Sequence, residues 1–148
     1  MAKARTNRAA WVIAVLLAVV VLGGVALLGV QLKPYWVAKY RGNGANLDGA
    51  VLIFPPLPGA DLMGASLSGA NLDSVDLRHA NLSLTTLSDA SLRGADLSRA
   101  DLSNANADGS DLRRADLTRV TLTGALYDAS TRWPAGFDPI KHGMVLVE

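Results

Sequence analysis

Leucine recurs at every fifth position between residues 47 and 122 of the 148-residue chain, and only Ala107 interrupts the series. Seventeen consecutive five-residue units, from Ala45 to Ala129, share this frame, and Tyr127 holds the leucine position of the last one. A period of five fits neither the 3.6-residue α-helix nor the two-residue alternation of a strand. It predicts a solenoid, in which the chain turns the same corner in every unit and neighbouring coils cover one another.

A second inward position lies two residues before each leucine and usually holds alanine. The exceptions are Pro55, Val75, Thr85, Ser110 and Val120. The other three positions are mostly polar or glycine, which suits tight turns. We therefore expect stacked columns of buried leucine and alanine, each leucine contributing about 1.5–3 kcal/mol by leaving water.

Units such as residues 60–64 (ADLMG), 70–74 (ANLDS) and 95–99 (ADLSR) resemble the repeats of the pentapeptide-repeat family. The resemblance covers 85 of the 148 residues. It implies an all-β solenoid, a right-handed, four-sided parallel β-helix with one unit per face and four units per coil. Residues twenty apart would then lie on top of each other. Ala107 and Tyr127 are such a pair, so either the tyrosine ring fills the space above the alanine or Tyr127 simply begins a cap.

The first units keep the frame but carry apolar residues at outward positions, namely Val51, Ile53 and Phe54. Prolines follow them, and proline cannot donate to a β-ladder, so this stretch is expected to be the lowest coil. Its apolar residues need a cover, which we expect from the chain upstream.

Residues 11–32 contain no charged side chain. As a helix they would be about 33 Å long, enough to cross a hydrocarbon core of about 30 Å. Trp11 at one end and Tyr35 with Trp36 at the other fit the aromatic belts of a bilayer. The alternative is a cleaved signal peptide, but the run is long for one and no convincing small-x-small cleavage site follows. We expect a single-pass membrane anchor that binds the lipid bilayer.

The flanking charges favour a cytoplasmic N-terminus and a repeat domain on the non-cytoplasmic side. Before the run lie Lys3, Arg5 and Arg8; after it lie Lys33, Lys39 and Arg41. The predicted organisation is a basic tail (1–10), a transmembrane helix (11–32), a juxtamembrane linker (33–44), the repeat β-helix (45–129) and a C-terminal cap (130–148).

The chain leaves the repeat pattern after residue 129, where Trp133 and Phe137 appear beside two prolines. An open solenoid end exposes core and strand edge, so these aromatics are the expected plug. Residues 127–139 also resemble a tail that follows pentapeptide repeats in some bacterial, notably cyanobacterial, proteins. Residues 144–147 are expected to add a short strand. A ligand pocket made by the two aromatics is the alternative.

The repeats carry eleven Asp, six Arg and no Lys or Glu, a net charge of −5, although the whole chain has +1. Sorted by face, all six arginines fall on two adjacent faces, together with a histidine. The expected partner-binding residues are Arg78, His79, Arg93, Arg99, Arg113, Arg114 and Arg119. The alternative is that solvent-exposed faces simply vary in composition.

No catalytic or cofactor-binding pattern is found. The chain has no Cys, His79 and His142 lack metal-ligand spacing, and no phosphate-binding glycine loop or nucleophile elbow occurs. We expect no enzyme, cofactor or metal, no small-molecule substrate, and no nucleic-acid binding because the repeats are acidic.

Two classes of function remain. The first is a membrane-anchored protein–protein interaction or structural scaffold module with an unidentified protein partner. The second comes from the family resemblance, since some members imitate DNA and bind a topoisomerase. Just over four coils give roughly 20 Å of rod, which spans only about six base pairs, and this disfavours the second class.

Overall fold

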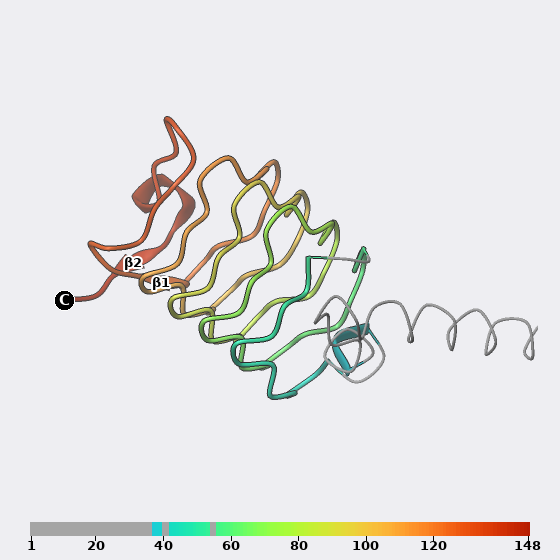
Figure 1. Ribbon diagram of the computed structural model, residues 1–148. Coiled ribbons are helices and arrows are strands. Elements are labelled where there is room, and N and C mark those ends of the chain that lie inside the picture. Colours follow the sequence, from blue (N-terminus) through green and yellow to red (C-terminus); the bar gives the residue numbers. More distant parts are fainter. Residues whose placement is uncertain (1–36, 40–41, 54–55) are drawn as a thin grey trace, which may run out of the picture. The chain divides into compact units, whose positions relative to one another are not determined.

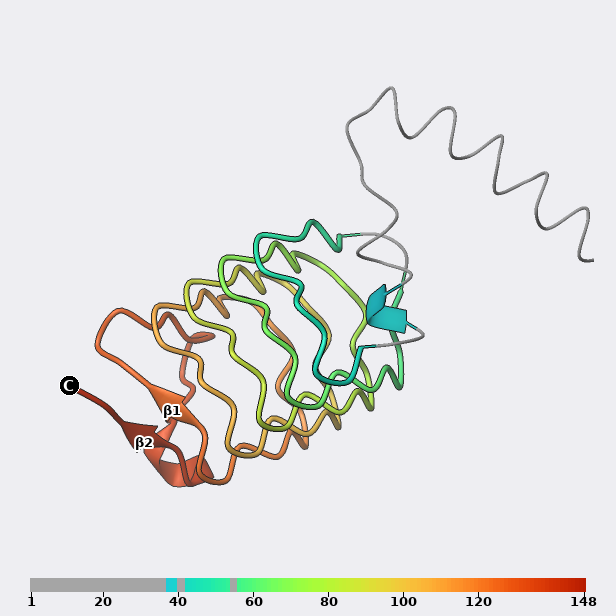
Figure 2. The same ribbon diagram turned by 90° about the horizontal axis from the view of Figure 1, so that it is seen from below.

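The computed structural model describes residues 37–39, 42–53 and 56–148, all within one compact unit, Lys33–Glu148. This unit is a stack of coils that advance steadily from its N-terminal to its C-terminal end (Figures 1 and 2). Its labelled elements are β1 (Leu126–Tyr127), the 3-10 helix η1 (Ile140–His142) and β2 (Val145–Leu146). The predicted transmembrane segment 11–32 and the basic tail 1–10 lie outside the described residues. Within the described ranges, no helix has the length and apolar character needed to cross a bilayer.

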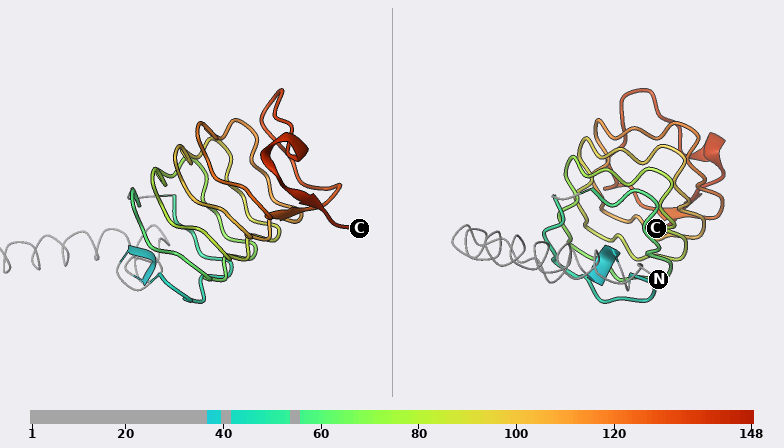
Figure 3. Two further views of the ribbon diagram at one scale, coloured as in Figure 1. Left: turned by 180° about the vertical axis from the view of Figure 1, so that it is seen from behind. Right: turned by 90° about the vertical axis from the view of Figure 1, so that its right-hand side faces the viewer.

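Successive coils pair in parallel with a step of twenty residues. The bridges Asn46↔Ser66, Ser66↔Thr86 and Thr86↔Asn106 join one face through four coils, and Asn106↔Leu126 continues the series. Each bridge uses two backbone bonds; for example, Leu67 N–H donates to the Thr86 carbonyl oxygen at 2.7 Å and Thr86 N–H donates to the Ala65 oxygen at 3.0 Å. Because the chain turns every five residues, twenty residues make a coil with four faces, as expected. Figure 3 shows the coils lying one behind another in both views.

The two inward columns form the core. Twelve leucines, from Leu52 to Leu102 and including Leu112, have less than 2% of their surface exposed. Two of the exceptional inward residues are polar and bond back to their own turn: the Thr85 hydroxyl donates to the Leu82 oxygen and the Ser110 hydroxyl to the Ala107 oxygen. A buried hydroxyl with such a partner carries little penalty.

The corners require a left-handed residue, which explains part of the glycine content. At Gly49 and at every fifth residue from Gly59 to Gly124, the residue two after the leucine position has φ between 56° and 73°. A backbone bond closes the turn, as from Ala50 N–H to the Leu47 oxygen at 3.0 Å. Glycine adopts this φ freely, whereas an L side chain costs about 1–2 kcal/mol. Eight corners nevertheless hold other residues: Ser74, His79, Leu84, Asp89, Arg99, Asn104, Arg114 and Arg119.

Asp and Asn are common in turns partly because they tolerate the left-handed conformation. The Asp or Asn before each leucine has a different role here. It does not occupy the left-handed corner; its side chain accepts the N–H of the residue after the leucine. Asn71 bonds Asp73 N–H at 3.0 Å and Asp101 bonds Ser103 N–H at 2.9 Å. The ladder and the turn use the other backbone N–H groups of the unit, so this side chain satisfies the remaining one.

The N-terminal end is covered from within the predicted linker. Residues 37–39 are helical, Ala38 is fully buried and Val37 packs against the core. Gly42 N-terminal to the first unit is also buried. Phe54 and Pro55 of the first coil lie outside the described residues. Of its outward apolar residues, Val51 is exposed and Ile53 is partly buried.

The C-terminal cap begins with a change of register. Asp111 bridges to Arg132, a step of twenty-one, so Trp133 takes the inward position above Leu112. Trp133 and Phe137 pack against the core as expected, and their rings stack with centroids 5.1 Å apart. The Tyr127 ring meets Trp133 edge-on at 5.7 Å and therefore belongs to this cap. Whether it also fills the space above Ala107 stays a prediction.

The expected final strand is β2, which pairs in parallel with β1 through Leu126↔Val145 and Tyr127↔Leu146. This step is nineteen residues, one fewer than in the repeats. Met144 is buried at its start, whereas Val145 and Leu146 are exposed. The cap thus closes the core with side chains but leaves an outer strand edge.

Candidate partner-binding faces

Two adjoining faces carry every arginine of the repeats. We call the face built from units 75–79, 95–99 and 115–119 the central arginine face, and the face built from units 70–74, 90–94 and 110–114 the lateral arginine face. The other two are the acidic faces, with six Asp and no Arg. The hydrogen-bonded coils fix the backbone of each face, so residues twenty apart present their side chains in straight columns.

Some of these arginines already have a carboxylate partner. The Arg78 guanidinium donates two bonds to Asp76, at 2.9 and 2.8 Å, and Arg113 contacts Asp111 at 2.6 Å. In both pairs the Asp lies before a leucine and the Arg directly after it. The Arg78 side chain lowers the pKa of the Asp76 carboxyl, and this carboxylate raises the pKa of Arg78.

Asp111 is a centre of charge on the lateral arginine face. Its carboxylate lies 3.9 Å from the Arg93 guanidinium and 3.8 Å from that of Arg132, in addition to Arg113. The Arg113 side-chain hydrogen bonds lower the pKa of Asp111 to about 2, and nearby Arg93 adds to this effect. Asp111 therefore stays ionised and holds these arginine side chains along the face.

The other three repeat arginines have no such partner. In the described ranges, no carboxylate lies within 4.0 Å of the guanidinium of Arg99, Arg114 or Arg119. All three are exposed and occupy left-handed corners, with φ of 60°, 64° and 58°. Arg99 and Arg119 belong to the same corner column, above His79 at φ 59°.

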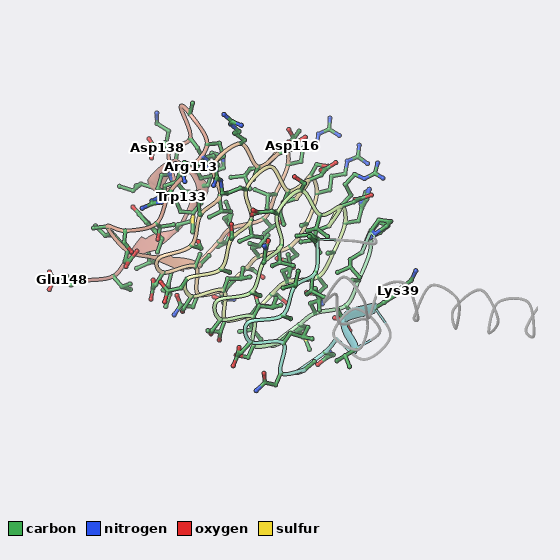
Figure 4. The ribbon with its side chains drawn as sticks, in the orientation of Figure 1. Lys39, Arg113, Asp116, Trp133, Asp138 and Glu148 are labelled. Atoms are coloured by element: carbon green, nitrogen blue, oxygen red, sulfur yellow. The ribbon has the colours of Figure 1, made fainter. Side chains whose placement is uncertain are left out.

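Two shallow grooves lie over these faces. The first, of about 470 Å³, follows the central arginine face and its corner column. It is lined by Arg78, His79, Ser98, Arg99, Asp116, Thr118 and Arg119. The second, of about 340 Å³, joins the lateral arginine face to the cap and is lined by Arg93, Arg113, Arg114, Trp133 and Ala135. In Figure 4, nitrogen-tipped side chains project from the edge of the stack that carries Asp116, and Arg113 lies close to Trp133.

The grooves bring together all seven residues expected from the sequence. Arg78, His79, Arg99 and Arg119 line one groove, and Arg93, Arg113 and Arg114 line the other. Sequence reasoning missed the linings contributed by Ser98, Asp116, Thr118, Trp133 and Ala135. The twenty-residue register contains the signal for the first three, because they lie on the same face. For Trp133 the twenty-residue register is misleading, because the step between coils becomes twenty-one residues where the cap begins.

On the acidic faces, too, several carboxylates turn back to the backbone. Asp128 accepts the Gly109 N–H at 2.9 Å and the Ser130 and Thr131 hydroxyls, and the Gly109 bond is the main cause of its lowered pKa. Asp61 and Asp101 accept the N–H two residues on. One oxygen of Asp108 is buried without a partner. Within the described ranges no group of three acidic or histidine side chains is arranged to hold a metal ion.

The family profile described as pentapeptide repeats matches residues 45–83 and 85–124, in eight copies. These ranges make up more than half of the chain. The search of curated proteins found no match to this chain.

Solved structures agree with this match. A pentapeptide-repeat protein from Nostoc Pcc 7120 is 38% identical, with a TM-score of 0.70 over 74% of this chain and 89% of that one. One from the cyanobacterium Cyanothece 51142 is 36% identical, with a TM-score of 0.61 over 62% of each chain. A third, from the thylakoid lumen of Arabidopsis thaliana, is 31% identical over 57% of this chain and 62% of that one, with a TM-score of 0.47. On the family match and the first two structures, the repeats form a right-handed quadrilateral β-helix.

Proposed function

Because this chain belongs to the pentapeptide-repeat family, whose fold is generally a non-enzymatic interaction fold, we propose that it is a membrane-anchored module that binds a protein partner through its two arginine faces. The coils of these faces are joined by backbone hydrogen bonds, such as Leu97 N–H to the Asp116 oxygen at 2.9 Å, so most of their backbone presents side chains without needing to order first. Preorganised surfaces lose less entropy on binding, which favours recognition of another macromolecule.

The observation that carries the proposal is the separation of charge around the stack. Arg78, Arg93 and Arg113, together with the three unpaired corner arginines, line the two grooves over these faces. Trp133 lies at the end of the second one. Arginine and aromatic side chains are enriched at protein interfaces, whereas both grooves are too open to enclose a small substrate.

Crosslinking in native membranes tests this proposal. The variant Arg78→Ala/Arg99→Ala/Arg119→Ala should lose the crosslinked partner that the unmodified chain captures. The control replaces Asp61 and Asp101 of the acidic faces by Asn, which keeps the bond to the backbone, and should retain the partner. If the triple arginine variant retains every partner, the central arginine face is not the binding surface.

The anchor is the second part of the proposal and rests on the uncharged run 11–32. A helix of that length and composition would insert stably in a bilayer, and the flanking basic residues favour placing the repeats on the non-cytoplasmic side. Deleting residues 11–32 should move the protein from the alkali-resistant membrane fraction to the soluble one. Protease added outside sealed, right-side-out vesicles should then degrade the repeats of the full chain only if they lie on the non-cytoplasmic side.

A topoisomerase-binding DNA mimic is not the function proposed. Such a surface needs carboxylates projecting at the density of DNA phosphates, about one charge per 1.7 Å of axis. Here Asp61, Asp101 and Asp128 of the acidic faces bond to backbone N–H groups. The corner arginines add the opposite charge on the remaining sides.

A further inference from the structure

We propose that the central arginine face binds an acidic, extended peptide segment of the partner, and that Arg99 and Arg119 are the residues that bind its carboxylates. This inference rests on the proposed interaction function and adds the chemistry of the partner. It also separates the arginines that recognise the partner from those that serve the fold.

The first argument is that Arg99 and Arg119 contribute nothing visible to the stability of the stack. Each occupies a left-handed corner, at φ 60° and 58°, where glycine is the least costly residue. Gly59 holds the first corner of the same column. In the described part of the chain neither guanidinium has a carboxylate partner. The fold therefore does not explain an arginine at either place.

The second argument is electrostatic. Residues twenty apart lie on adjacent paired coils, about 4.8 Å apart along the axis. Two like charges stacked at this distance repel each other, as directly opposed like charges do across a sheet. His79 lies in the same column, one coil below Arg99. An anionic ligand reduces the charge repulsion within such a column, and a ligand with several negative groups reduces it most.

The third argument concerns the geometry of that ligand. Alternate side chains of an extended peptide lie about 6.8 Å apart on one side. Exposed arginine side chains can spread from the backbone spacing of about 4.8 Å to match this repeat, and each guanidinium can bind a carboxylate through two parallel bonds. Ser98 lines the same groove, and its hydroxyl can donate to a peptide carbonyl group. An acidic strand running along the column would thus meet a donor at each coil.

The paired arginines define the limits of the site. Arg78 lines the groove, but its guanidinium is bonded twice to Asp76 and lies 3.7 Å from Asp96. Arg113 is held in the same manner by Asp111. Asp116, also in the groove, bonds Thr118 N–H and so remains tied to its own turn. The available positive charge is therefore at the corner column.

Binding of a fluorescent hexaglutamate peptide to the full chain in nanodiscs of zwitterionic lipid tests the inference. We expect saturable binding that weakens as salt is raised. The variant Arg99→Gly/Arg119→Gly should weaken it roughly tenfold, since two exposed ion pairs are lost. Its melting temperature should be equal or higher, because glycine suits the left-handed corner. The matched control, Ser74→Gly/Asn104→Gly, makes the same backbone change at two other corners and should bind as the unmodified chain does.

Other outcomes overturn the inference. If the double arginine variant binds hexaglutamate normally, these residues do not recognise carboxylates. If inorganic pyrophosphate, or vesicles containing an anionic lipid, compete at lower charge concentration than hexaglutamate, the ligand is a phosphate group and not an acidic peptide. A third outcome separates the two proposals. If the Arg78→Ala/Arg99→Ala/Arg119→Ala variant loses the crosslinked partner but the unmodified chain does not bind hexaglutamate, this inference is overturned and the proposed function stands.

Discussion

At the scale of single residues, the repeat is a solution to backbone hydrogen bonding. The Asp or Asn before the leucine satisfies the one N–H that neither the ladder nor the turn reaches. Where that position holds Ser, an Asp of the preceding coil replaces it: Asp48 accepts Ser68 N–H, and Asp73 accepts Arg93 N–H at 3.0 Å. In both cases the serine hydroxyl, of Ser66 or Ser91, also donates to that Asp. In these two units an acceptor thus lies at the usual place, although a residue of another coil supplies it.

This leads to a rescue prediction. Asp73→Ala removes the acceptor of Arg93 N–H and should lower the free energy of unfolding by about 1 kcal/mol. Adding Ser91→Asn puts an amide oxygen at the position that other units use, and should recover most of the loss. Urea unfolding followed by circular dichroism measures both. A double variant no more stable than Asp73→Ala alone would show that the acceptor is not what matters.

Asp111 gives a residue-scale prediction about pH. Its pKa is lowered from 3.8 to about 2 by Arg113, so its charge stabilises the folded state above about pH 4, and this contribution is lost as the pH falls towards 2. Asp111→Asn should therefore be less stable than the unmodified chain at pH 7, with the difference disappearing by about pH 2. Thermal melts at pH 7, 4 and 2 measure it. A difference that stays constant with pH would contradict this ion-pair account.

At the scale of elements, the two ends are built differently from the repeats between them. The repeats are interchangeable coils, but each end needs residues that occur once. At the C-terminal end the added residue before Arg132 turns Trp133 inward. At the N-terminal end, the helical residues 37–39 cover the first coil. A β-carbon on Gly42 would lie 2.5 Å from the Asp61 carbonyl oxygen, 2.6 Å from that of Ala38 and 2.7 Å from Leu62 Cδ2.

Gly42 therefore tests the N-terminal cover. Gly42→Ala forces two backbone segments apart and should destabilise the chain by about 1–3 kcal/mol. Gly44→Ala is the control: its β-carbon meets nothing within 4 Å, so only its φ of 62° opposes the change, at about 1 kcal/mol. Thermal melts of the two variants and the unmodified chain, all in one detergent, compare their stabilities. Equal losses would mean that residues 37–39 do not pack on Gly42 as described.

At the scale of the whole molecule, the sequence was sufficient wherever the five-residue frame holds. The inward leucines, the glycine corners and the grouping of arginines on two faces all follow from one period. It was insufficient where the frame changes, since steps of nineteen and twenty-one residues leave no repeating signal. Thus Trp133 as a plug was expected, but its place beside Arg113 was not. Nor did the frame alone separate Arg113, paired with Asp111, from the unpaired Arg119, although an Asp two residues before an Arg marks such pairs.

The twenty-residue register is the claim on which the corner column and both grooves depend, and disulfide formation tests it directly. The chain has no cysteine, so introduced pairs are unambiguous. Ser68 and Ser88 lie on adjacent coils of one face, with Gly69 N–H donating to the Ser88 oxygen at 2.8 Å. Mild oxidation should close an intramolecular disulfide in Ser68→Cys/Ser88→Cys but not in Ser68→Cys/Ser83→Cys, whose residues belong to neighbouring faces. Equal crosslinking of both pairs, or preference for the second, would contradict the stacked four-sided coil.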